Sequence, residues 1–411
     1  MSSFDVHAYR RVLAYPQAVR AFATSSIGRI AYTFVYLPLF YVTHAAAGSI
    51  AVAGAALGLY GAGAGMLAPG RAALIDRFGP RPMLTAMSAL FGSVLACLAL
   101  ASLLGAPAAG VVVLAGLAGA VAPPLGPTMR VAWATLVPEH EDLKTALSLD
   151  ATVEEVFYLA SPAIAGALLW KLEPGAVLLV PAALIVIGGV VFARSGAVAP
   201  MGSEQSREAG RGRSPLRARG FVPLLVFPLV AGGLAGFVTI YVPAATALSG
   251  PAVAGLVLAV FAVGSALGGL AYGTMRVKGG PPAHLGVLAV GLAGATACLA
   301  FAGSPASVAG MLLSPAMVVA YLLAPRIAPP DRQNSATTWV NTSYNIGSAA
   351  VTAAAGALIA HLGAQASALL VGLSALVVVV VAWWLASGRP SPSQSVSEVH
   401  EQQTSAVEAG R

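Results

Sequence analysis

The chain has 411 residues, of which 58% are hydrophobic and only 9% are charged, and its mean hydropathy is +0.83. Soluble domains carry about 25% charged residues, so this composition excludes a soluble protein. The net charge of +7 at pH 7 does not indicate a nucleic-acid partner, because the basic residues are spread over separate segments and form no single groove or helix face.

Long apolar runs follow one another along the whole chain, separated by shorter gaps. Most runs reach the roughly 20 residues that a helix needs to cross a bilayer. The sequence therefore predicts an all-α integral membrane protein with twelve transmembrane helices. The runs lie at 22–43, 49–70, 83–104, 108–130, 146–170, 175–193, 221–244, 252–275, 284–303, 307–325, 335–360 and 365–387.

The Lys and Arg residues indicate how the chain is oriented. Of 22 such residues, Arg29 lies inside the first run, 20 lie in gaps on one side of the predicted membrane and one lies on the other side. Basic residues resist translocation and so mark the cytoplasmic side. We therefore expect both termini in the cytoplasm. Only three of the 22 are Lys, and Ala, Gly and Val are abundant, which indicates a bacterial protein of the plasma (inner) membrane.

One long polar interruption divides the chain. Residues 195–219 are rich in Arg and have no apolar periodicity, which predicts a flexible cytoplasmic linker. It separates an N-terminal six-helix bundle at 1–194 from a C-terminal six-helix bundle at 220–387. The last segment, 388–411, is rich in Ser and Glu and is expected to be a disordered cytoplasmic tail.

Short repeats support a duplication of the six-helix unit. The letters AVAG occur at 51–54 and again at 252–255, and AGAL occurs at 165–168 and again at 355–358. Both pairs place the second half in register with the first. Such internal repeats are typical of secondary transporters.

The gap between the second and third runs carries a recognisable motif. Residues 71–84 read RAALIDRFGPRPML, in which Asp76, Arg77, Gly79 and Arg81 match a pattern of charged residues around a turn glycine. The sequence here resembles the major facilitator superfamily, which carries G-x-L-A-D-R-x-G-R-R-x-x-L at this place; Ala72, Ile75 and Pro80 depart from it. The resemblance implies two pseudo-symmetric bundles and a conformational role for Asp76 across the cytoplasmic seam. A loop Asp with local Arg partners is the alternative.

The fifth run contains three acids in an otherwise apolar helix. Ionised carboxylates are costly in hydrocarbon, so Asp150, Glu154 and Glu155 should face a cavity, a partner or a proton pathway. Asp150 and Glu154 share a helix face, whereas Glu155 is turned by about 100°. Two acids on one face suit a carboxyl group that binds and releases protons. Arg29 and Glu154 both lie about 12 Å deep, so an ion pair is allowed.

Three interpretations of these charges remain open. The ion pair could be a fixed salt bridge, or a proton or a cationic substrate could compete with Arg29 for the carboxylates. Alternatively, the helix boundaries are displaced and the acids reach cytoplasmic water. Farther along, SPAIAG at 161–166 resembles the G-P-x-x-G-G signature of antiporters in the family, with Pro162 and Gly166 matching; ordinary kinked packing is the alternative.

Two helix faces are candidates for lining a cavity. Tyr32 and Tyr36 follow Arg29 at helical spacing, and Asn341 and Asn345 do the same in the eleventh run. The resemblance implies substrate contact for the two tyrosines, because the first helix lines the central path in the family. Plain core packing is the alternative for them, and interhelical hydrogen bonds are the alternative for the asparagines.

These patterns predict a proton-coupled exporter of a small molecule, driven by the proton gradient and without a cofactor or metal site. Its expected partners are the lipid bilayer, the small-molecule substrate and protons, with no nucleic acid, and we expect a monomer. An uptake or facilitative carrier of the same fold, or a non-transporting membrane scaffold or sensor, remains an alternative. We expect no enzymatic activity, because no catalytic set of residues and no phosphate-binding loop is present.

Overall fold

The computed structural model describes residues 6–198, 216–274 except 217 and 219, 281–298 and 333–387, together with scattered positions between 313 and 328. This part of the chain is helical apart from short connections and contains no strand. Eight of its helices are long and apolar enough to span a membrane, or nine if one bent pair counts as a single span. The all-α membrane fold is confirmed. Most of the tenth predicted span and the whole tail at 388–411 lie outside the described residues.

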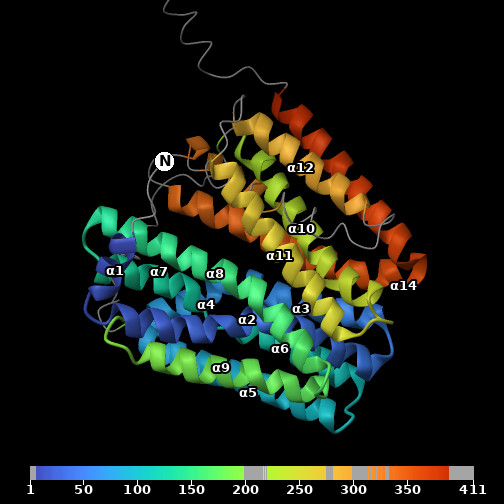
Figure 1. Ribbon diagram of the computed structural model, residues 1–411, viewed down its shortest axis with the longest axis horizontal. Coiled ribbons are helices and arrows are strands. Elements are labelled where there is room, and N and C mark those ends of the chain that lie inside the picture. Colours follow the sequence, from blue (N-terminus) through green and yellow to red (C-terminus); the bar gives the residue numbers. More distant parts are fainter. Residues whose placement is uncertain are drawn as a thin grey trace, which may run out of the picture.

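The helices form two groups, which Figure 1 shows in its lower part and in its upper part. The first group comprises α1 (Val6–Ala14), α2 (Ala18–Ala47), α3 (Ile50–Met66), α4 (Ala68–Phe78), α5 (Pro80–Leu103), α6 (Ala108–Val121), α7 (Leu125–Leu136), α8 (His140–Leu169) and α9 (Pro174–Ala193). The second comprises α10 (Phe221–Ala245), α11 (Pro251–Thr274), α12 (Pro281–Cys298) and α14 (Gln333–Ser387).

Prolines and a glycine divide two of the expected spans. The fourth run separates into α6 and α7 at Pro123 and Pro124, since proline lacks the N–H group that an uninterrupted helix needs. In α14 the backbone is non-helical at Gly363, with φ 80°, so the element consists of the two helices expected at 335–360 and 365–387. By contrast, α10 continues past Pro228 and Pro243.

The motif at 71–84 is not the loop that the sequence indicated. Its first part lies in α4, which bends by 43° from α3, and α5 begins directly at Pro80. Gly79 alone separates the two helices, with φ 89°, a backbone conformation that glycine adopts without steric cost. Proline at the first position of α5 favours this immediate restart, because its missing N–H would be unpaired there in any case.

The beginning of the linker also differs from the expectation of a flexible segment. Ser195, Ala197 and Val198 are buried, although the composition of 195–219 is polar. They follow directly from α9 and pack against the first helical group, with Gly196 next to the side chain of Gln17. The described start of the predicted linker is therefore packed against the helices, and most of the rest of it lies outside the described residues.

Helices α2 and α8 run in the same direction. Arg29 of α2 contacts Glu154 of α8, and farther along both helices the Thr33 hydroxyl lies 2.7 Å from that of Ser161. Both helices therefore end on the same side of the bundle. We call this side the Gly48 end, after the residue that terminates α2.

The two groups of helices meet mainly along two seams, α3 against α14 and α8 against α11. Each seam contains a contact between two glycines near the Gly48 end. A Cβ atom added to Gly54 would lie 2.9 Å from the Cα atom of Gly356, and one added to Gly166 would lie 2.9 Å from that of Gly255. These four glycines belong to the AVAG and AGAL repeats, so the repeated letters mark equivalent contacts between the halves.

We expect Gly166→Ala to destabilise the protein, because its methyl group would also lie only 2.7 Å from the carbonyl oxygen of Pro251. Overpacking of this kind costs about 1–3 kcal/mol. The melting temperature of the purified protein in detergent should therefore fall. Gly110→Ala is the control, since nothing lies within 4 Å of its added Cβ atom, and alanine favours the helix by about 1 kcal/mol. Equal melting temperatures for Gly166→Ala and the unmodified protein would contradict this packing.

Candidate functional site

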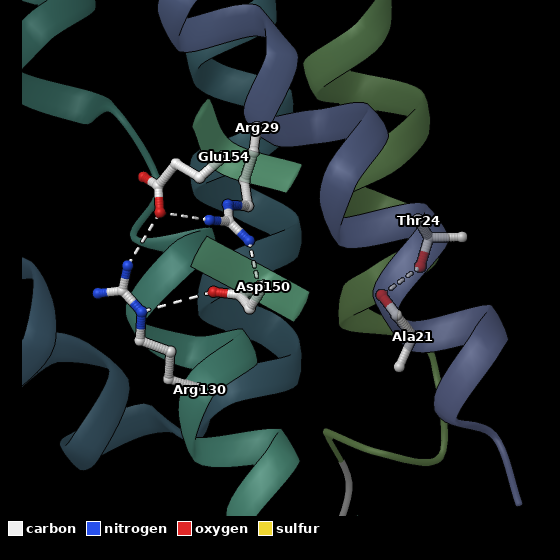
Figure 2. A network of polar contacts seen from close by, with 6 residues as sticks. All are labelled: Ala21, Thr24, Arg29, Arg130, Asp150 and Glu154. Atoms are coloured by element: carbon white, nitrogen blue, oxygen red, sulfur yellow. Dashed lines mark hydrogen bonds and ion pairs between the residues drawn. The ribbon is translucent and has the colours of Figure 1, made fainter. Parts of the chain in front are cut away.

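A network of charged residues lies inside the first helical group (Figure 2). The guanidinium of Arg29, on α2, donates from Nη1 to Oδ1 of Asp150 at 2.6 Å and from Nη2 to Oε2 of Glu154 at 2.7 Å. Arg29 is 3% exposed and Asp150 is 1% exposed. The ion pair that the depths of the residues allowed is therefore formed, and it includes both acids of the shared α8 face.

A second arginine completes this network. Arg130, on α7, donates from Nη2 to Oε2 of Glu154 at 2.9 Å, and its Nε lies 3.5 Å from Oδ2 of Asp150. The sequence pattern did not indicate this role, because Arg130 lies at the end of a run, where a basic residue reads as a topology signal. The available clue was that apolar residues continue beyond it, through VAWATL at 131–136. A charge flanked by apolar residues on both sides indicates a partner inside the protein.

The charges of this network cancel, because two guanidinium groups face two carboxylates. Every member comes from α2, α7 or α8, all within the first helical group. This geometry matches the fixed salt bridge that the sequence left open as one interpretation. Such a pair is stable only when both partners are kept, since an unpaired buried charge is costly.

Glu155, the third acid, lies elsewhere. It lines a cavity of about 380 Å³ between the two helical groups, and among the described residues its carboxylate makes no ion pair. The cavity lies between α2 and α8 of the first group and α10, α11 and α14 of the second. Its described lining is Thr33, Tyr36, Leu37, Glu155, Tyr158, Pro162, Ala235, Val238, Thr239, Leu258, Phe261, Ala262, Ser265, Leu313, Met317, Asn341, Tyr344, Asn345 and Ser348.

Several residues that the sequence singled out meet in this cavity. Tyr36 comes from α2, Pro162 from α8, and Asn341 and Asn345 from the first part of α14. A smaller chamber of about 110 Å³ adjoins it on the α3–α14 seam and shares Tyr36, Asn345 and Ser348 with it.

Other predicted site residues lie apart from the cavity. The Tyr32 hydroxyl donates to the carbonyl of Pro123, at the break between α6 and α7, and its ring packs against Phe91 inside the first group. Tyr32 therefore holds the fourth span in place instead of lining the cavity. Gly166 belongs to the α8–α11 seam.

The motif residues of α4 and α5 lie outside the cavity lining as well. Asp76 is exposed and has no ion-pair partner within the described part of the chain. The guanidinium of Arg77 lies over the Phe78 ring, 5.1 Å from its centroid, and Arg81 donates to the Ser195 carbonyl at 3.5 Å. These contacts stay within the first helical group. In this conformation the motif makes no described contact across the seam.

Arg71 has a structural role beyond the topology signal that its place in the sequence indicated. It is 7% exposed, and its guanidinium donates to the carbonyls of Gly63, Ala64, Gly119 and Ala120. These carbonyls belong to the last turns of α3 and α6, where helices leave acceptors unpaired and a cation is favoured. Arg71 therefore ties the bend after α3 to the break after α6.

Within the described residues, no three His, Cys, Asp or Glu side chains come together in a way that could hold a metal ion. The arrangement instead offers one carboxylate in a cavity with hydroxyl, amide and aromatic groups. Such a site can bind a cation or a proton.

We expect Asp150→Asn to lower stability strongly, since it removes one of the two carboxylates that neutralise buried Arg29. Breaking a buried pair by removing one partner costs about 3–5 kcal/mol. Thermal unfolding in detergent would measure the loss. Arg130→Gln is the comparison; its loss should cost less, because the Arg130 side chain is 52% exposed and Arg29 still faces both carboxylates. Equal losses for the two variants would contradict the central position of Arg29.

Comparison with known proteins identifies the family. The sequence profile of the Major Facilitator Superfamily matches residues 21–313 and 229–410. No curated protein sequence gives a significant match.

Solved structures share the fold at low sequence identity. The nucleoside transporter NupG has a TM-score of 0.72 and 12% identity, covering 90% of this chain and 99% of that one. A bacterial homolog of the human lysosomal transporter Spinster, inward-facing and occupied, has a TM-score of 0.67 and 16% identity, covering 95% and 100%. A bacterial homologue of the iron transporter ferroportin in an inward-facing state has a TM-score of 0.65 and 15% identity, covering 91% and 99%. The chain belongs to the major facilitator superfamily and is a membrane transporter.

Proposed function

We propose that this transporter exports a small molecule across the plasma membrane in exchange for protons. The observation that carries the proposal is the position of Glu155, a carboxylate with no described ion pair in a cavity lined by both helical groups. A group in this place can meet cargo from either side as the two groups of helices move about the cavity. The similar structures include a nucleoside transporter, a peptide transporter and a homologue of an iron transporter. The fold therefore does not determine the cargo.

The three carboxylates of α8 have different roles in this proposal. Asp150 and Glu154 are paired with Arg29 and Arg130, so both carboxylates already have cationic partners inside the first helical group. Glu155 has no such competitor among the described residues. Protonation neutralises its carboxylate, and cargo that needs the negative charge is then released. Proton and cargo therefore bind alternately, as exchange requires.

The proposed direction of transport, export, is compatible with the predicted orientation. If the basic gaps face the cytoplasm, the Gly48 end faces the exterior, and the glycine contacts of both seams close that end in this conformation. The cavity then takes up cargo from the cytoplasm. The exposed Asp76 is available to contact the second helical group in the alternate conformation, as its motif implies. An uptake or facilitative carrier would use the same cavity without proton exchange.

We expect Glu155→Gln to abolish proton exchange while the fold is retained, because glutamine keeps the shape of the side chain but does not titrate in this range. The protein would be reconstituted in liposomes with an acidic lumen and an internal pH-sensitive dye, and a panel of neutral, anionic and cationic drugs would be added outside. For each compound that the unmodified protein carries, the lumen should become more alkaline as protons leave.

Glu173→Gln is the matched control, since Glu173 is an exposed carboxylate at the start of α9, away from the cavity. It should exchange protons at the unmodified rate, whereas Glu155→Gln should lose at least about tenfold. A carried compound that enters without any change of lumen pH would identify a facilitative carrier and reject the coupling. If no compound crosses the liposome membrane with either the unmodified protein or Glu155→Gln, a scaffold or sensor is favoured.

A further inference from the structure

We propose that the cargo is an organic cation, with one positive charge on an apolar body that includes or accommodates aromatic rings. This inference rests on the proposed transport function and names the substrate class of its cavity. The sequence alone left cationic, zwitterionic and neutral cargo open, because it contained both Arg29 and the acids of α8 at similar depth. The location of each charge now separates these possibilities.

The charge of the cavity favours a cation. Among its described lining residues, Glu155 is the one ionisable acid, and no Lys, Arg or His is present. Arg29, which could have received an anionic group, is 3% exposed and faces Asp150 and Glu154 instead. An anionic or zwitterionic cargo would therefore meet a carboxylate without a compensating cation. A cationic cargo would find a partner that has no other described ion pair.

The aromatic rings of the cavity also favour a cation. Tyr36, Tyr158, Phe261 and Tyr344 line the same cavity, from α2, α8, α11 and α14. Tyr158 lies three residues after Glu155, so the two side chains emerge from neighbouring turns of α8. A cation over an aromatic face is attracted by the ring, and more strongly when it is desolvated. Aromatic rings from four helices in the same cavity as one carboxylate are a suitable environment for a charge carried on an apolar molecule.

The described lining of the cavity does not favour a metal ion as cargo. Calcium takes six to eight oxygen ligands, and transition metals prefer several nitrogen, sulfur or carboxylate ligands. The described lining offers one carboxylate, and no cluster of three metal-ligating side chains occurs in the described part of the chain. The volume of about 380 Å³ instead falls in the range of about 300–1,000 Å³ that holds drug-sized molecules.

Equilibrium binding to the purified full-length protein tests this inference directly. The probes are three cations (tetraphenylphosphonium, ethidium and benzyltrimethylammonium) together with two isosteres of the first, anionic tetraphenylborate and neutral tetraphenylsilane. At pH 8, at least one cation should bind saturably and the isosteres should not compete for its site. Glu155→Gln should weaken that binding at least tenfold, Glu155→Asp should weaken it less, and the Glu173→Gln control should leave it unchanged.

The outcomes also separate this inference from the proposed function. Failure of all three cations to bind, or equal binding to Glu155→Gln and the unmodified protein, would overturn the cationic cargo. Proton-coupled movement of neutral or anionic compounds alone would overturn it as well, while leaving the exporter in place. Glu155-dependent cation binding without movement of the bound cation across reconstituted membranes would instead support the site and reject the transport function.

Discussion

The buried guanidinium of Arg29 is the constraint on which the arrangement of the first helical group depends. A charge at this depth is tolerated only when partners surround it, and here Asp150 and Glu154 of α8 face it directly. Arg130 then balances the second negative charge and brings α7 against α8. Arg130 lies on the part of the fourth span that follows the break at Pro123 and Pro124.

This network also explains why Glu155 is available for other chemistry. Successive residues of a helix are turned by about 100°, so the residue after Glu154 cannot share the face that Arg29 occupies. It faces the second helical group instead and lines the cavity. One short stretch of α8 therefore supplies both the acids that neutralise Arg29 and a carboxylate without a described ion pair. The turn of the helix between Glu154 and Glu155 separates these two roles.

The sequence predicted which residues matter in this site better than it predicted where each side chain points. The depth of Arg29 and Glu154 allowed their ion pair, and helical spacing predicted that Asp150 shares the face of Glu154. Tyr32 and Tyr36 are only one turn apart, yet one binds the Pro123 carbonyl and the other lines the cavity. The burial of α2 by neighbours on several sides decides this difference, and periodicity carries no information about those neighbours. Arg130 was missed because a basic residue at the edge of a run serves equally well as a topology signal.

The location of each interaction determines what can change during transport. The four charged residues of the network belong to α2, α7 and α8, so movement of one helical group against the other leaves their ion pairs intact. The seams between the groups, in contrast, include close backbone contacts of Gly54 with Gly356 and of Gly166 with Gly255. A carboxylate that reports on such movement must face both helical groups, and among the described acids only Glu155 lies in the cavity between them. Coupling between proton, cargo and conformation is therefore expected at Glu155 and not at the more deeply buried acids beside it.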